Sequence, residues 1–439
     1  MKTKSRILLG IALGSAVASL ALAGCGSSNS RDGKRSSLAP EEARQICLSD
    51  PHDGSPVGQA IREHQDRARR LPDRPDEWIL VGKGWVRKAR RSADPGFYVN
   101  VEACADAALH ADEVSIAGLE LRSLALMNDH RFAEARDIAK TIVAKDPRHV
   151  VALGTLSDAL LELGQFEEGA DAAQKMMDVR PDMASYSRAS YLRWLQGDNA
   201  NAKLFIRYAL NGRDGRDPEP AAWTLVQAGM LYWSEGDYEG ADAVFDEALN
   251  WVPDYPAALV GRARVALSRN QPKSAVEDLE KAYEASPLVE TSWLLGDARQ
   301  MLGDTEGARS EYVRAVRQGK RTDRLTLAQY YATKDLAHDE ALKLIEEERG
   351  VRGGVYVDDT YAWALFRAGR IVEARVASDR ALRLGTRDAR ILYHAGAIRL
   401  AGGDTGGKDL IRKALSLNPK FDATGAAEAA RLAGLSDKG

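Results

Sequence analysis

The stretch that decides the fold is "GMLYWSEGDYEGADAVFDEALNWVP", residues 229–253. Gly229, Ala241 and Ala248 are small enough to let two antiparallel helices approach closely, while Phe245 fills the space around them. A central glycine lets the chain turn between the helices, and the final proline ends the second one. The stretch therefore predicts one complete helix-turn-helix hairpin.

The same pattern recurs along most of the chain. The small residue early in each second helix marks ten units, separated by 34, 34, 33, 39, 34, 33, 33, 33 and 33 residues. The marks are Val101, Ala135, Gly169, Ala202, Ala241, Ala275, Ala308, Ala341, Ala374 and Gly407. The long interval holds "GRDGRDPEP", residues 212–220, a loop rich in turn residues. Because one hairpin cannot bury its apolar face alone, neighbouring units must stack into a continuous core.

This repeat resembles the tetratricopeptide repeat family, and residues 229–253 carry the family pattern most fully. Prolines that match its last residue recur at Pro147, Pro181, Pro287 and Pro419. The resemblance implies an all-α fold, a right-handed superhelix (α-solenoid) of about ten helix-turn-helix repeats with a concave groove. We expect the repeat domain over residues 76–422, and a C-terminal capping helix and tail over residues 423–439.

The N-terminus has the pattern of an export signal, with basic residues before an apolar run that ends in small residues. The ending "LAGC" resembles the lipobox of bacterial lipoproteins, which implies removal of residues 1–24 and attachment of acyl chains such as palmitate to Cys25. Residues 25–75 then form the lipidated N-terminus, a polar tether and two short helices. Two alternatives are a simple secretory cleavage site and a retained membrane anchor. Gly26 favours the outer membrane, if the source has one.

Two further cysteines, Cys47 and Cys104, lie in this chain. An exported protein folds in a compartment that permits disulfides, so the two thiols could pair. Two buried free thiols are an equal alternative, because the sequence separation does not decide between them.

In the family the groove is lined by the first helix of each repeat. The corresponding positions in this chain are rich in large aromatic side chains, which recognition surfaces favour. They are Tyr191, Trp194, Trp223, Met230, Trp233, Trp293, Tyr330, Tyr356, Trp363 and Phe366. We expect them to form a partner-binding groove, although adjacent first helices could instead bury these rings between repeats. Trp251, late in a second helix, is expected to pack between repeats.

Composition and motifs exclude other functions. With 61 basic and 64 acidic residues, the chain has no basic field for nucleic acid. "GGDTGGKD", residues 402–409, lacks the Ser or Thr and the preceding strand of a phosphate-binding loop, so we expect no nucleotide. The seven histidines show no metal-ligand spacing. We therefore expect no metal, no cofactor and no enzymatic activity, since no space is left for a catalytic domain.

These features together predict a non-catalytic scaffold on a bacterial membrane, facing out of the cytoplasm. It would bind a peptide or helix of a protein partner in its groove and act in envelope assembly, secretion or pilus-type machinery. The alternative is a component of exopolysaccharide export whose groove binds glycan.

Overall fold

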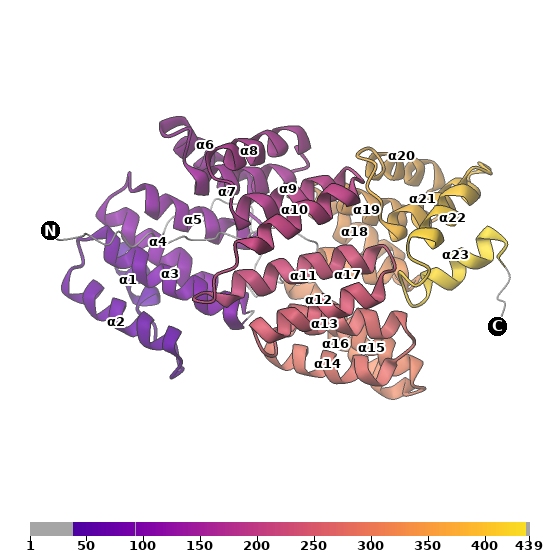
Figure 1. The fold of residues 1–439 in the computed structure, drawn as a ribbon, viewed down its shortest axis with the longest axis horizontal. Coiled ribbons are helices and arrows are strands. Elements are labelled where there is room, and N and C mark those ends of the chain that lie inside the picture. The colour runs from indigo at the N-terminus through magenta and orange to yellow at the C-terminus, as the bar shows by residue number, and fades with distance from the viewer. Residues whose placement is uncertain (1–37, 93, 436–439) are drawn as a thin grey trace.

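The computed structural model describes residues 38–92 and 94–435, and in them the chain forms 23 α-helices and one 3-10 turn (Figure 1). The helices are α1 (Pro40–Cys47), α2 (Pro56–Arg70), α3 (Pro75–Ser92), α4 (Tyr98–Ala111), α5 (Ile116–Asn128), α6 (Phe132–Lys145), α7 (Val150–Glu162), α8 (Phe166–Val179), α9 (Met183–Leu195), α10 (Asn199–Asn211), α11 (Pro218–Ser234), α12 (Tyr238–Trp251), α13 (Pro256–Ser268), α14 (Pro272–Ala285), α15 (Val289–Met301), α16 (Thr305–Thr322), α17 (Arg324–Thr333), α18 (His338–Arg349), α19 (Val355–Arg367), α20 (Ile371–Ala381), α21 (Ala389–Ala401), α22 (Gly407–Leu417) and α23 (Gly425–Ala433).

Helices α3 to α22 form ten consecutive hairpins, which we number units 1 to 10 from the pair α3 and α4 to the pair α21 and α22. All ten marker residues lie on second helices and are buried, as the 34-residue pattern requires. The pairs pack one after another along the chain (Figure 1). The prediction of an all-helical superhelix of about ten repeats is confirmed.

The hairpin of residues 229–253 shows why small residues are needed between helices. Phe245 of α12 is fully buried and packs against the neighbouring first helices α11 and α13. A Cβ at Gly229 would lie 2.6 Å from the Phe245 ring, so no larger residue fits without repacking. Gly236 has a φ of +74°, which permits the tight turn between the two helices.

The superhelix closes on itself after five units. Along a line of contacts that we call the seam, the turns inside units 3, 4 and 5 touch the connections that follow units 8, 9 and 10. The backbone N–H of Gly353 donates to the carbonyl of Glu162 (2.7 Å), and the Thr386 hydroxyl donates to that of Leu195 (2.5 Å). The amide of Asn418 donates to the carbonyl of Trp233 (2.8 Å). Along the seam, the chain itself therefore joins one level of the superhelix to the next.

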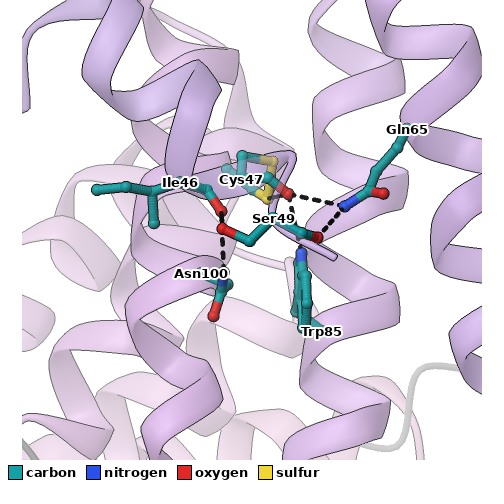
Figure 2. Close-up of a disulfide and its surroundings, with 7 residues drawn as sticks. Ile46, Cys47, Ser49, Gln65, Trp85 and Asn100 are labelled. Atoms are coloured by element: carbon teal, nitrogen blue, oxygen red, sulfur yellow. Dashed lines mark hydrogen bonds between the residues drawn. A yellow bond between two sulfur atoms is a disulfide. The ribbon is translucent and has the colours of Figure 1, made fainter. Parts of the chain in front are cut away.

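A disulfide between Cys47 and Cys104 joins the end of α1 to α4. Figure 2 shows how the carbonyls at the end of α1 are satisfied by side chains of the next helices. The Cys47 carbonyl accepts from Trp85 Nε1 (3.0 Å) and Gln65 Nε2 (3.2 Å), and the Ile46 carbonyl accepts from Asn100 Nδ2 (2.9 Å). Both cysteines are fully buried. Of the two alternatives that the sequence left open, free thiols or a disulfide, the structure shows the disulfide. This bond fixes α1 to the first repeat.

The predicted signal peptide and Cys25 lie outside the described residues, so lipid attachment stays a prediction. The two short helices expected in residues 25–75 are α1 and α2, and the capping helix is α23. None of the helices within residues 38–92 and 94–435 is long and apolar enough to cross a membrane.

Candidate functional site: a chamber inside the superhelix

Closure of the superhelix leaves a partly open cavity of about 250 Å³, which we call the chamber. Its wall combines the ends of the first helices of units 1 to 4 with the beginnings of the first helices of units 5 to 9. The aromatic and charged residues of this wall are Arg90, Tyr98, His130, Phe132, Glu162, Phe166, Tyr191, Glu219, Trp223, Tyr255, Glu290, Arg352, Tyr356 and Arg383. A cavity lined by apolar side chains with a few convergent polar groups is typical of a binding site.

One polar cluster in the wall links unit 1 to units 5 and 6. The hydroxyl of Tyr255 donates to Glu219 Oε1 (2.8 Å), and Arg90 lies close enough to both to interact electrostatically. Burial raises the pKa of Glu219 and raises that of Tyr255 well above its usual value. Such perturbed groups beside a cavity mark a candidate functional site.

A second polar cluster lies at the seam. Arg352 forms ion pairs with Glu162 (Nη1 to Oε2, 3.4 Å) and Glu348 (Nε to Oε1, 2.7 Å). Burial raises the pKa of Glu162 and places that of Tyr191 well above its usual value. Tyr356 accepts a hydrogen bond from Trp194 Nε1 (2.8 Å) across the seam. This cluster both closes the superhelix and lines the chamber.

The charges of the wall balance one another. Three arginines, Arg90, Arg352 and Arg383, stand against three glutamates, Glu162, Glu219 and Glu290. The glutamates have partners in the protein, and Glu290 is paired with Arg264. Because bringing a charged group into a buried site without an opposite charge is costly, the chamber favours a ligand with little net charge.

The remaining predicted groove aromatics gather toward the C-terminal half, in a set that we call the aromatic row. It consists of Trp233, Trp293, Tyr330, Trp363 and Phe366. Trp293 and Tyr330 meet edge to face with ring centroids 5.5 Å apart, and Trp363 stacks on Phe366 at 4.8 Å. Edge-to-face and offset-stacked pairs of this kind stabilise a core.

Polar contacts and the chain's own C-terminal segment complete the aromatic row. Trp363 stacks on His394 with centroids 4.0 Å apart, and the Nδ1 atom of His394 lies 3.0 Å from the Asp359 carboxylate. Trp233 Nε1 donates to the Ser268 hydroxyl (3.1 Å), which in turn donates to the Lys420 carbonyl (3.2 Å). The surface of the aromatic row is thus covered by other side chains and by backbone of the protein itself.

The structure separates the ten predicted groove residues into groups. Tyr191, Trp223 and Tyr356 line the chamber. Trp194 lies beside the chamber residue Tyr356, and Met230 packs among the apolar residues of α11 and its neighbours. The other five residues form the aromatic row. Five of the ten are less than a tenth exposed: Trp194, Trp223, Trp293, Tyr330 and Trp363. Their role in partner binding stays a prediction, but none of these five projects from an open groove.

The expected contrast between Trp233 and Trp251 is weaker than predicted. Both side chains are partly buried, and the guanidinium of Arg213 lies 5.7 Å from the centre of the Trp251 ring. Trp251 packs against the apolar cluster of α11 and α12 as expected, but it is not fully buried.

Sequence reasoning missed the polar residues of the chamber. Arg90, Glu219, Tyr255 and Arg352 do not stand at the family's groove positions, and they line one cavity only because units 1, 5, 6 and 9 converge there. One signal in the sequence could have indicated the seam beside the chamber. Gly353 and Gly354 precede α19, and glycine is common where two backbone segments lie close together, as these two do with Gly164.

No other candidate chemistry gains support. Residues 402–409, "GGDTGGKD", form the turn of unit 10 and the start of α22. In the part of the chain that the structure describes, no group of three or more His, Cys, Asp or Glu side chains is arranged to hold a metal ion.

Two profiles of the tetratricopeptide repeat match residues 126–191 and 226–290. These segments coincide with hairpins of units 2 to 4 and 5 to 7. The chain is a tetratricopeptide repeat protein. Such repeats typically bind protein partners and generally act as non-catalytic scaffolds. A comparison with curated proteins gives no match.

Several solved structures resemble this tetratricopeptide repeat protein. PilW, a widely conserved type IV pilus biogenesis factor, is 14% identical with a TM-score of 0.40, covering 46% of this chain and 93% of PilW. A human IFIT1 dimer with PPP-AAAA is 12% identical with a TM-score of 0.47, covering 86% and 94%. A tetratricopeptide repeat protein from Parabacteroides merdae is 17% identical with a TM-score of 0.40, covering 56% and 93%.

Proposed function

We propose that the protein is a lipid-anchored, non-catalytic scaffold of the bacterial cell envelope that holds a segment of a protein partner in the chamber. The observation that carries this proposal is the chamber itself, a cavity of about 250 Å³ in a chain whose repeats are of a kind that typically binds protein partners. The aromatic row, on the same face, is packed against the protein's own side chains and C-terminal segment. A partner segment therefore finds its room in the chamber.

Location in the envelope is supported by two features of the N-terminal region. The lipobox-like ending at Cys25 follows an export signal in the sequence. The buried disulfide between Cys47 and Cys104 is a bond that persists in oxidising compartments outside the cytoplasm. The polar tether between Cys25 and α1 would let the repeat domain reach partners near the membrane.

The membrane part of the proposal is tested by Cys25→Ser. The variant should appear in the soluble fraction of the envelope, while the unaltered protein sediments with membranes and is released by detergent. Sedimentation of the variant with membranes would show that another feature anchors the chain.

The binding part of the proposal is tested by crosslinking in intact cells, followed by identification of the material captured with the full chain. We expect a discrete protein partner whose yield falls in Tyr191→Ala, at the chamber, and is kept in Val372→Ala, which changes a side chain 81% exposed on the outer helix α20. Equal yields from both variants would remove the chamber from the proposal. Capture of a polysaccharide in place of protein would favour the export alternative.

A further inference from the structure

The seam follows a rule that the chain repeats at successive units. The turn inside each of units 3, 4 and 5 is covered by the connection that comes after the unit five positions later. A Cβ at Gly164 would lie 3.1 Å from the backbone nitrogen of Gly354, and a Cβ at Gly236 would lie 3.2 Å from the Leu417 carbonyl oxygen. The turns of units 3 to 5 therefore contact the connections after units 8 to 10 closely, through backbone atoms and small residues.

The same rule leaves later turns without a cover in the described chain. Cβ atoms at Gly303, Gly369 and Gly403, in the turns of units 7, 9 and 10, would meet no atom within 4 Å. Ten units make two levels of five, so the turns of units 6 to 10 form one edge of the superhelix. The connections after units 1 to 5 form the opposite edge.

The uncovered turn of unit 7 and the turn of unit 8 next to it expose large apolar side chains. Met301, Leu302 and Leu336 are 39%, 42% and 47% exposed, and they lie on consecutive turns of the same edge. Exposed apolar residues that gather on one edge, where the chain elsewhere makes a close contact, mark an interaction surface.

The opposite edge carries residues of the kind that cover a turn within the seam. Pro419 contacts Gly236 in the seam, where its Cδ atom would lie 3.5 Å from a Cβ. Pro147 and Pro181 occupy the equivalent place in the connections after units 2 and 3, and both are exposed. Lys145 and Arg148 are exposed with Asp146 around Pro147, while Asp304 and Glu306 are exposed around the turn of unit 7, so the first surface is more basic and the second more acidic.

We infer that this edge docks onto a second copy of the same chain, head to tail, with the turns of units 7 and 8 against the connections after units 2 and 3 of the next copy. The contact continues the five-unit rule of the seam from one molecule to another. In Figure 1 helices α6 and α8, next to these connections, lie at the top of the view, while α15 and α16, which flank the turn of unit 7, lie at the bottom, so the two surfaces are at different places on the molecule. A contact between two different surfaces is heterologous and forms an open stack unless the rotation closes it into a ring.

The test is a cysteine pair placed across the inferred contact in the full chain and oxidised in intact cells. Leu302→Cys combined with Arg148→Cys should give a ladder of dimers, trimers and larger species on non-reducing gels. A disulfide needs Cα atoms within about 7 Å, so the ladder reports direct contact. The native Cys47 and Cys104 are already joined to each other and stay out of the reaction.

Each single variant should remain monomeric, as should the matched control that pairs Arg148→Cys with Val372→Cys on the outer helix α20. A second pair, Leu336→Cys with Arg180→Cys, should repeat the ladder through the neighbouring unit. A dimer formed by Leu302→Cys alone would show a symmetric contact and overturn the head-to-tail arrangement. Monomers from both pairs, at normal expression on reducing gels, would overturn the inference entirely.

Discussion

The chamber and the aromatic row are built from the same face of successive first helices, yet they end in opposite states. In the aromatic row, Trp363 is 2% exposed and covered by His394 and Phe366. In the chamber, Tyr191 and Tyr356 keep part of their surface accessible in a cavity that no side chain fills. The difference comes from what each face meets, because side chains and the C-terminal segment pack directly onto the row, while the wall of the chamber surrounds unfilled space. An aromatic residue at a groove position can thus contact a partner only where the superhelix leaves room beside it.

The largest expected effect is the loss of stability on truncating the aromatic row. Trp363→Ala removes a buried indole and leaves a cavity, which should lower the free energy of unfolding by about 3 to 5 kcal/mol. Chemical denaturation monitored by circular dichroism measures it. A loss below about 1 kcal/mol, within the range of ordinary surface changes, would mean that the row is not packed as described.

Loss of the disulfide, which lies outside both regions, gives a reference value for the change in the free energy of unfolding. Replacing Cys47 and Cys104 together by serine removes the link between α1 and unit 1 and should cost about 2 to 4 kcal/mol in the same unfolding measurement. Partner capture by the chamber should persist under conditions where the variant stays folded. Loss of capture in a folded double variant would place part of the binding site at α1.

Partner binding should respond to the chamber and not to the aromatic row. Tyr191→Ala should weaken binding by about 2 kcal/mol, roughly 30-fold in Kd, with a smaller effect on unfolding. Phe366→Ala is the matched control, since it also truncates a partly buried aromatic side chain at a predicted groove position. Titration of each purified variant with the partner identified by crosslinking gives the comparison, and equal losses in both would erase the distinction between the regions.

The smallest expected effect is a pH dependence from the first polar cluster. Burial raises the pKa of Glu219 in the folded state, so its protonated form is favoured on folding. That contribution to stability is fully present below the unfolded pKa of about 4.3 and is lost as pH rises through the folded pKa. Glu219→Gln should therefore gain stability relative to the unaltered protein as pH rises. A difference that is flat with pH would show that Arg90 and Tyr255 compensate for the buried charge.

The sequence was sufficient for the architecture because its signals are local. The spacing of small residues from Val101 to Gly407 predicted both the number of units and the buried face of every second helix. Turn residues such as Gly236 and helix-ending prolines such as Pro253 act within one hairpin, where chain neighbours decide the outcome.

The closure of the superhelix could not be predicted in this way. Contacts such as that between Thr386 and Leu195 join residues 191 positions apart, and they depend on small rotations that accumulate over five units. The chamber follows from the closure, so residues such as Arg90 and Glu219 had no local pattern to mark them. The same accumulation decided which aromatic groove residues were covered and which were left beside a cavity.

The most direct test of the central claim places a photo-activated crosslinking residue at Tyr191, in the chamber, or at Phe366, in the aromatic row, of the full chain in intact cells. The account predicts a covalent adduct with the protein partner from position 191 and none from position 366. An adduct from position 366 with none from position 191 would contradict it, because the partner would then bind where the structure shows a packed core.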